Sequence, residues 1–75
     1  MKFRNIDYLL DGNGEITLGR VGPVPCAAIA ADDDNRCLAM LVRNQGESLT
    51  QLLSRLDAAI EGALERDEFI DEING

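Results

Sequence analysis

The most regular hydrophobic pattern in the chain lies in residues 48–65. Ser48 is followed three residues later by Gln51, a capping-box pattern that marks the start of a helix. After Ser48, apolar residues recur at i, i+3, i+4 and i+7 and form a stripe about 120° wide. These residues are Leu49, Leu52, Leu53, Leu56, Ile60, Ala63 and Leu64. The sequence therefore predicts an amphipathic helix in its C-terminal half.

Two shorter segments near the N-terminus alternate apolar and polar residues with a period close to two. Residues 3–10 (F-R-N-I-D-Y-L-L) do so with one fault, and residues 15–21 (E-I-T-L-G-R-V) do so regularly. The sequence D-G-N-G lies between them, and its glycines and asparagine tolerate positive φ. This pattern predicts a first β-hairpin.

A second hairpin is predicted from residues 26–31 (C-A-A-I-A-A) and 37–43 (C-L-A-M-L-V-R), which flank the acidic sequence D-D-D-N-R. The alanine-rich half also suits a helix, but the prolines before it and the aspartates after it leave too little room. Residues 22–25 (G-P-V-P) form a connector or a strand entrance, because proline cannot donate a hydrogen bond to the sheet.

These elements predict an α+β fold, with an antiparallel sheet of two hairpins (about four strands) packed against one C-terminal amphipathic helix. The 75 residues form a single domain, 1–75, with a small core that needs support such as oligomerisation. Residues 67–75 either prolong the helix or form a mobile acidic tail with three apolar anchors.

The second hairpin is apolar on both of its predicted faces. One face carries Cys26, Ala28, Ala30, Cys37, Ala39 and Leu41, and the other carries Ala27, Ile29, Ala31, Leu38, Met40 and Val42. One helix can cover only one face, so the first hairpin or a second copy of the protein covers the other. We expect a homo-oligomer whose interface draws on Ile29, Leu38, Met40, Val42, Phe69, Ile70 and Ile73.

The formal charge of −7 narrows the choice of partners. It counts against binding nucleic acid or an anionic membrane, both of which need a clustered basic surface. It suits a basic protein partner, and it also serves solubility alone. Because the sequence has no apolar run of the length of a signal peptide or a membrane span, we expect a cytoplasmic protein.

Two acidic segments invite interpretation as cation sites. D-G-N-G resembles the middle of an EF-hand loop, but that alignment places Leu9 at the first ligand position and Arg20 at the twelfth. We therefore interpret it as a turn. Adjacent side chains diverge in an extended segment, so the cluster from Asp32 to Asp34 is interpreted as a solvated hairpin tip. We expect neither a metal nor a cofactor.

The chemistry of the remaining residues indicates no enzyme. The predicted hairpin pairs Cys37 with Ala30 and Cys26 with Leu41, which sets the cysteines too far apart for a disulfide. The chain has no histidine, so the cysteines lack a histidine base or co-ligand, and we interpret them as apolar filler. No phosphate-binding or dinucleotide-binding motif is present.

Residues 46–60 (G-E-S-L-T-Q-L-L-S-R-L-D-A-A-I) resemble the strand-to-helix junction of HicB-type antitoxins. That family consists of small acidic α+β proteins that neutralise a ribonuclease toxin. The chain departs from the family pattern, because it lacks a D-L-P-G-C-type segment before the helix and a C-terminal DNA-binding extension. As a whole it is similar to short proteins of bacterial genomes.

Two functions follow as hypotheses. The first is a non-enzymatic, self-associating protein-interaction module. The second, which the resemblance implies, is an antitoxin-like acidic inhibitor of a basic protein. In that case the segment around Phe69, Ile70 and Ile73 would be the docking element.

Overall fold

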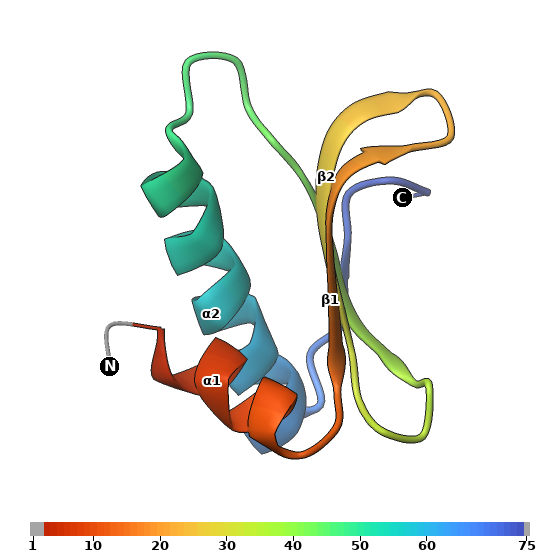
Figure 1. The fold of residues 1–75 in the computed structure, drawn as a ribbon, viewed down its shortest axis with the longest axis vertical. Coiled ribbons are helices and arrows are strands. Elements are labelled where there is room, and N and C mark those ends of the chain that lie inside the picture. The colour runs from red at the N-terminus through yellow and green to blue at the C-terminus, as the bar shows by residue number, and fades with distance from the viewer. Residues whose placement is uncertain (1–2, 75) are drawn as a thin grey trace.

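The computed structural model describes residues 3–74, which contain two helices and four strands (Figure 1). In chain order these are α1 (Arg4–Asp11), β1 (Glu15–Val21), β2 (Val24–Ala31), β3 (Cys37–Val42), α2 (Leu49–Arg66) and β4 (Ile70–Asp71). The strands form one sheet in the order β1-β2-β3-β4. The first three are antiparallel, and β4 runs parallel to β3 after the crossover through α2. The predicted α+β class, with four strands and a C-terminal helix, is confirmed.

Both helices lie on the same face of the sheet (Figure 1). The predicted stripe of α2 supplies Leu52, Leu56 and Ile60, which are fully buried. Alanines of β2 and β3 lie beneath α2, and their small side chains let the helix approach the sheet closely. The buried core consists of Leu9, Ala28, Ala30, Leu38, Ala39, Leu41, Leu52, Leu56, Ala59 and Ile60.

The predicted capping box at the start of α2 is confirmed. The Ser48 hydroxyl accepts a hydrogen bond from the Gln51 N–H at 3.1 Å, and the Gln51 side-chain oxygen accepts one from the Ser48 N–H at 2.8 Å. Two N–H groups at the helix start thus gain partners within the same local sequence.

The prediction of a strand over residues 3–10 was wrong, because this segment forms α1. Ile6 and Leu9, three residues apart, lie on one side of the helix against the core. α1 has no capping side chain of its own. Instead the Asp57 carboxylate of α2 accepts hydrogen bonds from the N–H groups of Asn5 and Ile6, at 2.9 and 3.0 Å. This partner lies about fifty residues away in the sequence, so local pattern does not reveal it.

The D-G-N-G sequence turns the chain, as predicted, but it joins α1 to β1 and not one strand to another. Asn13 has a φ of 66°, in the left-handed region that asparagine tolerates. Gly14 lies directly against α1: a Cβ on Gly14 would be 2.6 Å from Leu9 Cγ. The first hairpin therefore comprises β1 and β2. Its turn is at Gly22 and Pro23, so the first half of G-P-V-P is a hairpin turn and not a connector between hairpins, whereas Val24 and Pro25 form the predicted strand entrance.

The second predicted hairpin, β2 with β3, is confirmed, but its predicted register was wrong by two residues. Ala28 pairs with Leu41, and Ala30 pairs with Ala39. A bulge follows, in which Ala31 pairs with Cys37 and leaves Leu38 unpaired. The extra residue turns the Leu38 side chain toward α2, where only 3% of it is exposed.

After α2 the chain forms a further strand and does not prolong the helix. Asp67 takes a left-handed conformation (φ 56°) and ends α2. Ile70 and Asp71 then pair with Ala39 and Met40, and the Glu72 N–H donates to the Met40 carbonyl at 2.7 Å. The fourth strand is thus supplied by this segment and not by residues 3–10.

Among residues 3–74, neither helix combines the length and the apolar character needed to cross a membrane.

Candidate functional site

The face of the sheet opposite the helices has no helix over it (Figure 1). Ile29 pairs with Met40, and Ala27 pairs with Val42. These pairs alternate with the core pairs beneath α2, so their side chains point away from the helices. Ile29, Met40 and Val42 are half-buried, and we call these three residues the uncovered face. The prediction that β2 and β3 are apolar on both faces is confirmed.

The structure separates the seven residues expected at an interface. Ile29, Met40 and Val42 share the uncovered face, whereas Leu38 belongs to the core. Phe69 and Ile70 lie at β4 and are 54% and 41% exposed. Ile73 is half-buried in the turn after β4. Leu38 was therefore wrongly assigned, because the bulge moves it to the other face.

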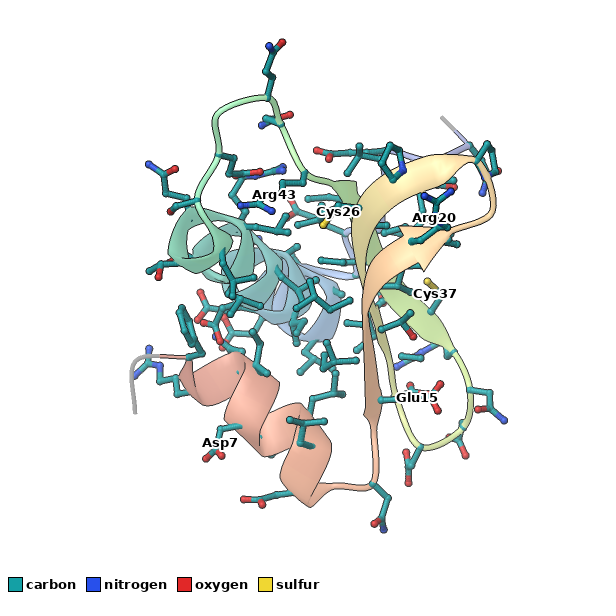
Figure 2. All side chains as sticks on the ribbon, turned by 45° about the horizontal axis from the view of Figure 1, so that its top comes forward. Asp7, Glu15, Arg20, Cys26, Cys37 and Arg43 are labelled. Carbon is teal, nitrogen blue, oxygen red and sulfur yellow. The ribbon has the colours of Figure 1, made fainter. Side chains whose placement is uncertain are left out.

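The two cysteines lie on opposite faces of the sheet and not on one. Figure 2 shows Cys26 pointing toward α2 and Cys37 pointing away from it. Cys26 packs against the core, and both thiols are free. Burial raises the pKa of the Cys37 thiol, which disfavours the reactive thiolate. This arrangement fits cysteines that fill space.

The acidic cluster from Asp32 to Asp34 forms the turn between β2 and β3, as predicted. Asp32 accepts hydrogen bonds from the N–H groups of Asp34 and Arg36, and it forms an ion pair with the Arg36 side chain at 3.0 Å. The Arg36 N–H and the other donors hold the Asp32 pKa below its usual value. Although the three carboxylates lie within 4.8 Å of one another, Asp32 already serves the turn.

A hydrogen-bonded group around Arg55 fixes the segments at both ends of α2. The guanidinium of Arg55 binds Glu47 at 2.7 and 3.0 Å, the Val42 carbonyl at 2.9 Å and Glu72 at 3.0 Å. The other Glu72 oxygen accepts from the Val42 N–H at 2.9 Å. Sequence reasoning missed this group, because its members come from four separate parts of the chain: β3, the loop before α2, α2 and the turn after β4.

The Arg55 side chain and the Asn44 N–H lower the Glu47 pKa from its ordinary 4.5 to about 2. Glu47, in turn, raises the pKa of the Arg55 guanidinium. Both groups therefore stay charged over the whole neutral range. Their role is to tie the loop before α2 to the segment after it.

A groove of about 240 Å³ runs between α2 and β4. Ala58, Gly62 and Ile70 contribute to its lining, together with Arg55 and Arg66. Arg66 is paired with Glu68 at 3.0 Å, and Arg55 is paired as described. Both cations of the groove are thus already neutralised by neighbouring carboxylates.

The outer edge of β1 is a second surface with unsatisfied backbone groups. Among the described strands, β1 pairs only with β2. Leu18 of β1 is 46% exposed, although its partner Ala28 lies in the core. Within residues 3–74, no polar or charged side chain is buried. The distinctive features of the molecule are therefore apolar surfaces and an open strand edge.

No protein-family model, no curated protein and no solved structure matches this chain. The resemblance of residues 46–60 to HicB-type antitoxins stays a prediction.

Proposed function

We propose that the protein is a non-enzymatic interaction module that self-associates through the uncovered face of its sheet. The supporting observation is that Ile29, Met40 and Val42 lie together on a sheet face that no helix covers. An apolar sheet face is stabilised when another layer covers it. A second copy supplies an identical face, and a two-fold axis brings the two faces together.

The size of the molecule is compatible with this assembly. A stable interface of ordinary size buries about 800 Å² of each partner. That is about one sixth of the 4845 Å² of accessible surface of this chain. A molecule with principal extents of 29, 25 and 21 Å can provide this area from one face. Burial of apolar area is also the type of stabilisation that a chain with a small core needs.

The test is the mass of the Met40→Lys variant, measured by analytical ultracentrifugation across a wide concentration range. Lysine is about as long as methionine and would lie beside Asp71, the partner of Met40 in β4. The fold should therefore survive, and circular dichroism checks that it does. The expected result is a lower mass for Met40→Lys and an unchanged mass for the control Met40→Leu. Equal masses for wild type and Met40→Lys would refute the proposed interface.

A second candidate function, antitoxin-like inhibition of a basic protein, is supported by the segment after α2. Phe69 and Ile70 are exposed there, and acidic residues surround them in a chain of charge −7. An apolar anchor among carboxylates suits a basic partner surface. In a co-expression pull-down, a stoichiometric basic partner should bind the wild type and be released by salt or by Phe69→Ala. Equal recovery with Phe69→Ala would rule out this docking segment.

A further inference from the structure

The two edges of the sheet differ in how far they are protected. At the β4 edge, a two-residue strand and the Glu72 carboxylate occupy the backbone of β3. At the other edge, β1 offers seven residues whose outward backbone groups pair with no described strand. The sequence of β1 contains neither proline nor lysine, two of the residues that commonly block such edges. A bulge interrupts β1 between Gly19 and Val21, but residues 15–19 pair regularly with β2. This regular part of the β1 edge can therefore accept another strand.

The helix layer is incomplete above the end of β1. α1 lies beside the C-terminal half of α2, where Asn5 contacts Asp57 and Glu61 (Figure 1). It then leads through a short turn into the start of β1. In the middle of β1, Leu18 is on the helix side but 46% exposed.

Two-fold symmetry would bring complementary parts of two copies together at this edge. In an antiparallel pair of β1 strands, the start of one strand lies beside the end of the other. Each copy's α1 would then lie above the end of the other copy's β1, in the incomplete part of the helix layer. Leu10 of α1 is 50% exposed, so it can supply an apolar side chain to this contact.

We propose that β1 pairs antiparallel with β1 of a second copy, and that each α1 covers Leu18 of the other copy. The two four-stranded sheets then form one continuous sheet with all helices on the same side. This inference rests on the proposed self-association but uses a different surface from the uncovered face. Two copies of the continuous sheet joined through their uncovered faces make a closed tetramer.

This arrangement covers two of the exposed leucines. Among residues 3–74, Leu10 is 50% exposed and Leu18 is 46% exposed. Single exposed apolar residues are ordinary, but these two belong to consecutive elements, α1 and β1, that border the same edge of the sheet.

The test uses Leu18→Lys and Leu10→Lys, with Leu18→Met as the matched control. Both leucines are about half exposed in one copy, so the fold of a single copy should tolerate lysine, as circular dichroism would verify. Analytical ultracentrifugation should show a tetramer for the wild type and for Leu18→Met. It should show half that mass for each lysine variant. Leu18→Lys would bring two charges together near the two-fold axis, and Leu10→Lys would place a charge against Leu18 of the other copy.

Hydrogen exchange gives an independent readout. The Met40→Lys variant lacks the uncovered-face contact. At high protein concentration, its outward N–H groups of β1 should still be protected from exchange with solvent. Adding Leu18→Lys to the same chain should abolish that protection. A wild-type mass retained by either Leu18→Lys or Leu10→Lys would overturn the inference. A mass that responds to Leu18→Lys but not to Met40→Lys would overturn only the uncovered-face interface.

Discussion

Asp57 is a capping residue for a helix to which it does not belong. Its carboxylate accepts hydrogen bonds from the N–H groups of Asn5 and Ile6 and from the Asn5 side chain. The first N–H groups of a helix have no partner within the helix, and the residue before α1 is Phe3, whose side chain provides no capping bond. A negative charge at this end also interacts favourably with the helix dipole.

Asp57→Ala should therefore lower the free energy of unfolding by about 1–2 kcal/mol, the usual cost of losing a cap. Urea denaturation followed by circular dichroism measures this change. Asp33→Ala, at the exposed tip of the β2–β3 turn, is the control and should change stability by no more than about 0.5 kcal/mol. Equal stabilities of the two variants would show that Asp57 does not cap α1.

Glu47 makes stability depend on pH at the acidic end of the range. Folding lowers its pKa from 4.5 to about 2, so the ionised carboxylate stabilises the fold. This contribution is complete above about pH 4.5 and is lost as the pH falls toward 2. When the pH is lowered from about 4.5 to 2, the free energy of unfolding of Glu47→Gln should therefore fall less than that of wild type. Urea titrations at several pH values measure this difference. Glu15→Gln is the control, because Glu15 forms no ion pair in the described structure, and it should keep the wild-type slope.

At the scale of elements, the joint between α1 and β1 depends on a close approach at Gly14. A Cβ there would meet Leu9 Cγ at 2.6 Å and the Leu9 carbonyl oxygen at 2.7 Å. A Cβ on Gly12 would be 3.6 Å from the Tyr8 carbonyl oxygen and 3.7 Å from the Leu9 carbonyl oxygen, which are ordinary contact distances. The two glycines are two residues apart and differ in how closely the chain surrounds them.

Gly14→Ala should cost about 1–3 kcal/mol, because a backbone oxygen must move to admit the methyl group. Gly12→Ala should be neutral or slightly stabilising, since alanine restricts the unfolded chain. Thermal and urea unfolding of the two variants compare these effects directly. A Gly14→Ala variant as stable as Gly12→Ala would show that α1 can shift away from β1 without cost.

The elements differ in how much of them the sequence could predict. α2 has a local cap and a long stripe, so its start and its buried residues Leu52, Leu56 and Ile60 could be read from spacing. Leu49 and Leu64 of the same stripe are exposed. α1 is eight residues long, its alternation resembles a strand, and the carboxylate that caps it is remote. β4 has two residues and depends on β3 and on the Arg55–Glu72 ion pair. An element that depends on partners far away in the sequence is therefore hard to predict from its own residues.

The candidate interface shows the same limit at finer detail. Ile29, Met40 and Val42 were placed together correctly, because a register error of two residues keeps every side chain on its face. Leu38 was misplaced, because one bulge residue reverses the alternation. No apolar pattern in C-L-A-M-L-V distinguishes a bulged strand from a regular one.

At the scale of the whole molecule, stability should depend on protein concentration. Assembly stabilises the folded state by mass action, because only folded copies can associate. Raising the concentration should therefore raise the Tm of the wild type. The Met40→Lys, Leu18→Lys double variant should have a Tm that does not change with concentration. Scanning calorimetry at several concentrations makes this comparison, and a constant wild-type Tm would contradict both proposed contacts.

The remote cap of α1 has a consequence for synthesis on the ribosome. Residues 4–11 leave the exit tunnel well before Asp57, which lies 52 residues after Asn5 in the chain. An isolated helix of this length is unstable in water. During translation, α1 therefore gains its cap only after α2 has emerged, although it is synthesised before α2.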